Sequence, residues 1–355
     1  MTQSNQIITG ASAAILIMLA SACGRGGAVE TSEAARPANG EVNVYSARHY
    51  DSDLAIYDAF TAETGIRVNL IEAGGDALIE RLSREAEASP ADVFITADAG
   101  ILWRAEDRGV LRPIEDPAIL ERVPAQFRDP ENEWVALSKR ARIIIYDKAR
   151  GAPEGLSDYD DLASPKFAGE ICVRSSTNVY NQSLLAGIIE NEGAEKAEEW
   201  TKGVVANFAR KPEGNDTSQI EAVAAGQCRI SIVNSYYLAR YVGSDNARMR
   251  AIGEKVGFIF PNQDTTGTHI NISGVGVARY APDPENAEKL IAFLLSDEAQ
   301  EAFAAGNNEY PVVAGVKASG PISSFGEFRA DTIDMSALGA HQTQAVKIFD
   351  RSGWR

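Results

Sequence analysis

Tyrosines in three short blocks are the side chains of this sequence best suited to chemistry. The chain has eleven tyrosines; Tyr50 follows a histidine, Tyr180 lies in a ValTyrAsn triplet, and Tyr236 and Tyr237 are adjacent. A phenolate oxygen is a hard, anionic ligand for a small, highly charged cation. A free tyrosine has a pKa of about 10, so it ligates a metal only if the metal displaces its proton. Since a single tyrosine is more typical of packing, such a site requires several of them together.

The elements that would position these tyrosines alternate between strands and helices, which predicts an α/β fold with parallel, doubly wound sheets. Tyr50, Tyr180 and the pair at 236–237 each follow an expected strand, at the end where open α/β sheets place ligands. We expect Tyr180 in a loop and the tyrosine pair at the start of a helix, whose dipole favours phenolates. The expected strands are 42–46, 66–71, 92–96, 141–146, 170–174, 229–233, 256–260 and 270–278. The expected helices are 52–64, 76–88, 99–108, 183–190, 194–208, 217–225, 284–295, 297–305 and 336–350, with a loop at 162–167.

Composition narrows the function classes. The 355 residues include 34 Lys and Arg against 50 Asp and Glu, a net charge of −16, with 45% hydrophobic and 24% charged residues. This is typical of a globular protein of about two domains and excludes electrostatic attraction to nucleic acid or anionic lipid. Three Cys and three His are too few for a multi-cysteine zinc module.

The N-terminus predicts export. An apolar run at 11–22, which carries no charged side chain, is too short to span a bilayer but fits the core of a signal peptide, which we place at residues 1–22. Cys23 follows in a lipobox-like LeuAlaSerAlaCys segment and is a lipidation candidate, while AlaSerAla within it also fits ordinary cleavage. A misplaced start or a buried N-terminal helix is the alternative. Residues 23–40 are small and polar and predict a flexible tether.

Export bears on the remaining cysteines. Cys172 and Cys228 each begin an apolar, strand-like run, and an oxidising compartment permits a disulfide between them. Two buried free thiols are the alternative.

Several blocks of the chain resemble the periplasmic iron(III)-binding proteins of ABC transporters, most closely the cyanobacterial type. The resemblance runs from about residue 41 to 354. The blocks are YSARHYDSD (45–53), SPADVFITADAG (89–100), LSKRAR (137–142), RSSTNVYNQS (174–183), GNDT (214–217), VNSYYLAR (233–240) and FPNQD (260–264).

The resemblance implies a type II periplasmic-binding-protein fold, with two lobes, two crossing strands, a hinge and a ligand cleft between the lobes. It places the N-terminal lobe at 41–138 with about 269–312, and the C-terminal lobe at 139–268 with about 313–355. Its Fe(III) ligands fall on Tyr50, Tyr180, Tyr236 and Tyr237.

His49, Arg140 and Arg240 are expected next to the four tyrosine ligands. His49 is either a fifth ligand or a solvent-exposed histidine that hydrogen-bonds nearby. Arg140 and Arg240 are candidates to compensate the −1 charge that four phenolates leave around Fe(III); solvated or interlobe salt bridges are their alternative. The other tyrosines are expected to be packing residues, and His269 and His341 structural or surface residues.

An enzyme is the rival class, but the sequence contains no G-x-S-x-G, P-loop or H-E-x-x-H motif. The stronger rival is another small solute on the same scaffold, either an oxyanion held by SerSerThr at 175–177 or an organic molecule. We therefore expect a non-enzymatic, monomeric binding protein, periplasmic or lipid-anchored, that carries Fe(III) as its transported ligand to an ABC permease. It would contact a membrane only through its N-terminal anchor.

Overall fold

The structure, a computed structural model, describes residues 40–355. These residues lie in one compact unit. The expected signal peptide at 1–22, Cys23 and the tether up to residue 39 lie outside the described residues. No helix in the described part of the chain is both long and apolar enough to cross a membrane.

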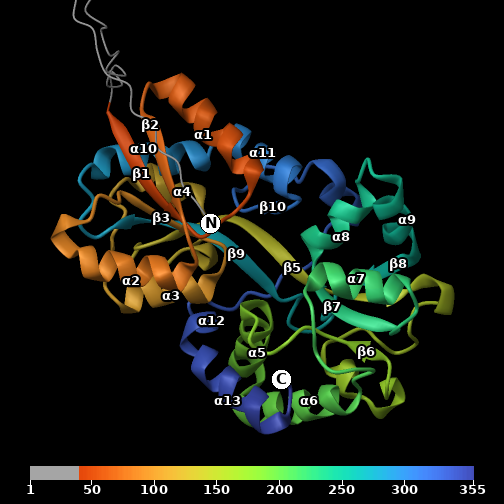
Figure 1. Ribbon diagram of the computed structural model, residues 1–355. Coiled ribbons are helices and arrows are strands. Elements are labelled where there is room, and N and C mark those ends of the chain that lie inside the picture. The colour runs from red at the N-terminus through yellow and green to blue at the C-terminus, as the bar shows by residue number, and fades with distance from the viewer. Residues whose placement is uncertain (1–39) are drawn as a thin grey trace, which may run out of the picture. The chain divides into compact units, whose positions relative to one another are not determined.

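One mixed sheet runs through the molecule (Figure 1). Its main path has the strand order β2-β1-β3-β9-β5-β7-β6, while β4 pairs with β9, and β8 and β10 pair with β5. The strands are β1 Glu41–Ser46, β2 Arg67–Glu72, β3 Val93–Thr96, β4 Leu111–Arg112, β5 Val135–Asp147, β6 Ile171–Cys172, β7 Ile230–Asn234, β8 Val256–Ile259, β9 Ile270–Ala278 and β10 Tyr310–Pro311.

Two long strands, β5 and β9, cross between the halves of this sheet (Figure 1). Both are antiparallel to their neighbours, whereas the pairs β1–β2, β1–β3 and β6–β7 are parallel. The α/β class is therefore confirmed, but the expectation of purely parallel sheets is wrong at these strands. Periodicity reports that a strand is buried and does not report its direction, which explains the error.

Helices cover both halves of the sheet (Figure 1). They are α1 Asp51–Thr64, α2 Gly75–Glu85, α3 Ala99–Asp107, α4 Pro117–Arg122, α5 Val179–Glu192, α6 Ala194–Ala206, α7 Asp216–Ala224, α8 Ser235–Val242, α9 Ala247–Lys255, α10 Pro284–Leu294, α11 Asp297–Asn307, α12 Ala337–Ala340 and α13 Gln342–Ser352. The start of α1 and its end at Gly65, which has a φ of 71°, agree with the sequence expectation.

Several boundaries differ from the expectation. The segment expected as a loop at 162–167 contains two short 3₁₀ helices, Asp160–Ala163 and Pro165–Phe167. The helix expected at 336–350 is interrupted at His341, which separates α12 from α13. The strand expected at 170–174 is reduced to β6. Helices α4 and α9 were not expected; each begins at a side-chain cap, Asp116 and Asn246 respectively.

Apolar side chains form separate clusters on the two sides of the crossing strands. The largest cluster includes Val44, Phe94 and Leu290 and draws mainly on the chain before residue 138 and after residue 269. Two smaller clusters draw mainly on residues 141–260 and include Trp200 and Val233. The lobe boundaries given above stay a prediction.

A disulfide joins Cys172, at the end of β6, to Cys228, just before the neighbouring strand β7, with 5.8 Å between their Cα atoms. The expected pairing is confirmed. The bond links two segments that are 56 residues apart in the sequence.

Candidate metal centre

The four tyrosines singled out in the sequence lie together. The hydroxyl of Tyr236 donates a hydrogen bond to the hydroxyl of Tyr180 at 3.2 Å, and the rings of Tyr236 and Tyr237 lie 4.3 Å apart between their centres. The guanidinium carbon of Arg240 lies 5.5 Å from the ring centre of Tyr50, 5.0 Å from that of Tyr236 and 5.6 Å from that of Tyr237. One arginine thus faces three of the four phenols.

Helix starts position these tyrosines. Tyr50 is the N-cap residue of α1, and Tyr236 and Tyr237 lie in the first turn of α8, as expected. Tyr180 also lies in the first turn of a helix, because the side chain of Asn178 caps α5 by accepting a hydrogen bond from the backbone N–H of Tyr180. The expectation that Tyr180 lies in a loop is therefore wrong. Because the N-terminal end of a helix is electropositive, all three positions favour a phenolate.

Arg140 is buried behind this group. Its guanidinium donates to the hydroxyl of Ser273 and to the backbone carbonyl of Ala97, which are both neutral. Its guanidinium carbon lies 5.8 Å from the ring centre of Tyr180. The positive charge of Arg140 therefore acts on the phenols as well as on the carboxylates of Glu309 and Asp98.

Arg48 is a site residue that the sequence reasoning missed. It is buried and forms ion pairs with Asp53 at 2.8 Å and with Glu309 at 3.0 Å. Its guanidinium carbon lies 4.8 Å from the ring centre of Tyr50. The available signal was its place two residues before Tyr50, inside the block 45–53.

Asp216 is a second missed residue. It is fully buried and pairs with Arg142 at 2.7 Å and with Arg174 at 2.9 Å. The guanidinium carbons of these arginines lie 5.9 Å and 5.3 Å from the ring centre of Tyr180. Both arginines and the aspartate occur in the blocks 137–142, 174–183 and 214–217, but nothing in the sequence shows that they meet.

Burial raises the pKa of Tyr50, Tyr180 and Tyr236 above the ordinary value of a phenol. Glu309 adds to this increase in the pKa of Tyr50, and the neighbouring tyrosines add to it at Tyr236. Arg140 acts in the opposite direction and lowers the pKa of all three. The phenols of Tyr50, Tyr180 and Tyr236 are consequently neutral at physiological pH, so a cation that binds them has to displace their protons.

His49 lies beside the tyrosines in sequence but faces another group. Its Nδ1 atom is 3.4 Å from a carboxylate oxygen of Glu72, and more than half of its side chain is exposed. This contact agrees with the second of the two roles considered for His49, a solvent-exposed histidine that interacts with a nearby side chain. A role for His49 as a metal ligand stays a prediction.

The remaining histidines lie elsewhere. His269 is buried, and His341 is partly exposed with its Nε2 atom 2.7 Å from Glu190. Within residues 40–355, no group of three or more His, Cys, Asp and Glu side chains is arranged to hold a metal. The tyrosine group is the candidate metal site of this part of the chain.

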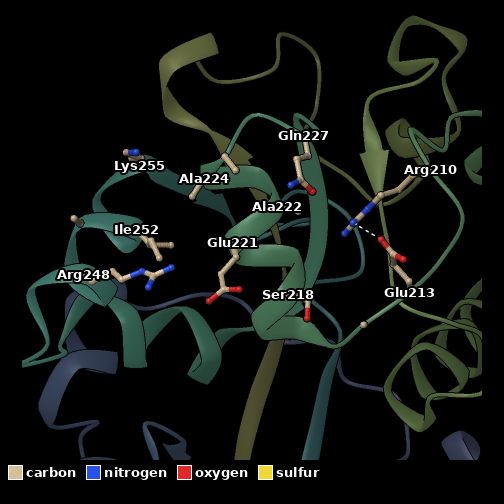
Figure 2. A pocket seen from close by; sticks show the side chains of 13 residues that line it. Arg210, Glu213, Ser218, Glu221, Ala222, Ala224, Gln227, Arg248, Ile252 and Lys255 are labelled. Carbon is tan, nitrogen blue, oxygen red and sulfur yellow. Dashed lines mark hydrogen bonds and ion pairs between the residues drawn. The ribbon is translucent and has the colours of Figure 1, made fainter.

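A pocket of about 680 Å³ lies along α7 and α9, and Figure 2 shows its lining. Its charged side chains are largely engaged: Arg210 pairs with Glu213, and Glu221 accepts a hydrogen bond from Tyr241. None of the four tyrosines lines it. The pocket is therefore separate from the candidate metal centre.

Comparison with known proteins gives consistent matches. The chain is 48% identical to Iron uptake protein A1 of Synechocystis, over 89% of this chain and 88% of that protein. It superimposes with a TM-score of 0.86 on a Trichodesmium protein (IdiA, FutA) in complex with iron and citrate ligands, at 52% identity over 89% of this chain and 100% of the other.

More distant relatives agree. The Major ferric iron-binding protein of Neisseria meningitidis is 28% identical over 91% of this chain and 96% of its own length. The structural matches confirm the periplasmic-binding-protein fold that the resemblance implied. The sequence profile of the bacterial extracellular solute-binding proteins matches residues 88–323, more than half of the chain. The protein therefore belongs to the family of bacterial extracellular solute-binding proteins.

Proposed function

We propose that this protein captures Fe(III) through the phenolates of Tyr50, Tyr180, Tyr236 and Tyr237 and delivers it to the permease of an ABC-type iron transporter. The observation that carries the proposal is the convergence of these four side chains, with the hydroxyls of Tyr236 and Tyr180 3.2 Å apart. A small trivalent cation is the partner that such a set of hard oxygen donors suits. The iron-binding relatives described above support the same ligand.

Charge balance is the second element of the proposal. Four phenolates around Fe(III) leave a net charge of −1, which would be costly in a site that is partly withdrawn from water. The guanidinium groups of Arg140 and Arg240 face the rings and offset this charge. Iron displaces the phenol protons, and the phenolate form of the tyrosines is stabilised once iron is present.

Export, delivery and the absence of catalysis belong to the same proposal. A member of an extracellular solute-binding family that carries a signal peptide works outside the cytoplasm, in the periplasm or attached through Cys23 to the membrane surface. It acts as a monomer, and its partner is the permease rather than a nucleic acid or a substrate to be converted.

The test uses the visible charge-transfer absorption of Fe(III) phenolates. We expect the purified protein to become coloured with Fe(III), and the variant Tyr236→Phe with Tyr237→Phe to lose both the colour and tight binding. Tyr280→Phe, which removes an exposed phenol, is the matched control and should behave like the wild type. An unchanged spectrum and affinity in the double variant would refute the assignment, and stabilisation by an oxyanion instead of iron would favour another solute.

A further inference from the structure

Asp216 occupies a position that connects two of the tyrosine-bearing helices. It is the first residue of α7 and is completely buried. Three donors converge on its carboxylate: Arg174 on Oδ1 at 2.9 Å, and Arg142 and the backbone N–H of Asn234 on Oδ2 at 2.7 Å and 2.8 Å. No hydrogen bond joins the carboxylate to any of the four phenols, although its charge contributes to the raised pKa of Tyr180. An effect of Asp216 on the positions of the tyrosines therefore has to pass through these donors.

One connection leads to Tyr180. Arg142 also donates to the side-chain oxygen of Asn181 at 2.9 Å. The amide nitrogen of Asn181 donates in turn to the backbone carbonyl of Arg174 at 3.0 Å. The guanidinium groups of Arg142 and Arg174 both lie against the ring of Tyr180. Asp216 therefore holds both arginines beside the first turn of α5.

The other connection leads to the tyrosine pair. Asn234 ends β7 and is the N-cap residue of α8, immediately before the turn that carries Tyr236 and Tyr237. Its backbone N–H is bound by the carboxylate of Asp216, and its side-chain oxygen accepts a hydrogen bond from Arg142 at 3.2 Å. The same carboxylate thus connects the start of α8 to the two arginines beside α5.

The chemistry of this position favours a carboxylate over a neutral amide. A carboxylate only accepts hydrogen bonds and has room for about four of them, whereas an amide would turn an N–H₂ group toward one of the donors. The buried guanidinium group of Arg142 and the partly buried one of Arg174 also need a counter-charge. Asp216 meets both requirements at once.

We propose that Asp216 is a positioning residue that sets the separation of Tyr180 from Tyr236 and Tyr237 and thereby the iron affinity of the site. This inference rests on the proposed function, since it assumes that these phenols bind Fe(III). Partners outside the ligand shell commonly change metal affinity by about 10- to 100-fold when they are removed. We expect an effect of this size.

Chemical rescue provides the test. Asp216→Ala should lower Fe(III) affinity by about 10- to 100-fold and weaken or shift the charge-transfer band. Added formate should restore both, because its carboxylate can enter the space left by the side chain and accept the same three hydrogen bonds. Chloride at equal ionic strength should not, since it screens charge without bridging the donors. Wild-type affinity in Asp216→Ala, or equal effects of formate and chloride, would overturn the proposal.

Two further variants separate positioning from a loss of stability. Asp216→Asn keeps the size of the side chain and leaves no room for formate, so its Fe(III) affinity should be reduced and formate should not restore it. Wild-type affinity in Asp216→Asn would count against the proposal. This outcome decides the question even if Asp216→Ala does not fold. Asp92→Ala removes another buried carboxylate, which accepts backbone hydrogen bonds from Asn43 and Asp283. It should lower the melting temperature with iron binding unchanged. If wild-type protein itself shows no iron band, the proposed function fails rather than the role of Asp216.

Discussion

The hydroxyl groups of Tyr236 and Tyr180 are joined by a hydrogen bond of 3.2 Å, although 56 residues separate them in the sequence. Both oxygens therefore already lie within a distance that a single cation can bridge. A cation that bound both oxygens would have to replace the proton that Tyr236 donates to Tyr180.

Removal of the Tyr180 phenol should weaken iron binding without unfolding the protein. In Tyr180→Phe the ring stays in place beside Arg142 and Arg174, while one anionic ligand is lost. We expect a reduced charge-transfer absorption per iron and an affinity lower by at least about tenfold, measured by titration against a competing chelator. The control is Tyr310→Phe, which removes a buried hydroxyl that has no hydrogen-bond partner in the described structure. Equal affinity of Tyr180→Phe and the control would contradict the ligand assignment.

Iron affinity should fall as the solution becomes more acidic. Burial raises the pKa of Tyr50, Tyr180 and Tyr236 above the ordinary value, so the apo site is protonated throughout the range below about pH 10. Each phenolate formed then releases one proton, and the apparent affinity should drop by about tenfold per pH unit for each such proton. Chelator competition at several pH values between about 6 and 8, together with direct measurement of released protons, checks this slope. An affinity independent of pH is the contrary outcome.

Arg240 should contribute through its charge. Its guanidinium faces the rings of Tyr50, Tyr236 and Tyr237, and Arg240→Met leaves the −1 charge of the iron site less compensated. We expect a loss of about 10- to 100-fold in Fe(III) affinity, with a smaller loss in Arg240→Lys. Arg250→Met is a suitable control, because Arg250 is exposed and donates to the backbone carbonyl of Ser244. If Arg240→Met and Arg250→Met bind iron equally well, Arg240 has no such role.

His269 should make the apo protein sensitive to acid. Burial, with Arg142 and Arg140 nearby, lowers the pKa of His269 to about 3, whereas an unfolded histidine has a pKa of about 6.5. Between these two pKa values, His269 is protonated in the unfolded chain but not in the folded chain. Stability is therefore lost as the pH falls from about 6.5 toward 3, at roughly 1.4 kcal/mol per pH unit.

Urea unfolding of the apo protein as a function of pH measures this dependence. His269→Gln should flatten it, while His341→Gln, which changes a partly exposed histidine, should leave it in place. The same acid dependence in wild type and His269→Gln would show that other groups cause it.

The disulfide should contribute substantially to stability. It closes a segment of 56 residues between Cys172 and Cys228, for which the chain-entropy estimate is about 4 kcal/mol. Replacing both cysteines by Ala should lower the free energy of unfolding by an amount of this order in denaturant titrations. Iron-induced colour should persist, since neither cysteine is among the proposed ligands. A reducing agent should lower the melting temperature of the wild type and leave that of the double variant unchanged.

The sequence was sufficient to predict the helix that begins at Ser235 and the strand Ile270–Ala278, because turn residues and apolar periodicity mark them clearly. It did not reveal that Tyr180 lies on a helix. The cap at Asn178 resembles a loop residue as readily as a helix start, and the apolar pattern of α5 becomes regular only from Leu184 on.

The charged partners of the tyrosines were harder to predict. Arg48 and Glu309 form a buried ion pair across 261 residues of sequence, and Asp216 meets Arg142 across 74. Such pairs depend on how the two halves of the sheet are assembled, and neither local propensity nor periodicity contains that information. The family resemblance identified the four tyrosines in the sequence. The ion-pair network around them is visible only in the three-dimensional structure.

The position of β9 between β3 and β5 has a consequence for biosynthesis. The sheet that starts at residue 41 lacks an inner strand until residue 278 has been made, 182 residues after the end of β3 at Thr96 (278 − 96). At ribosomal rates of about 5–20 residues per second, this delay is roughly 10–35 s. Throughout that interval the nascent chain cannot complete its first half, so this part of the sheet is finished only late in synthesis.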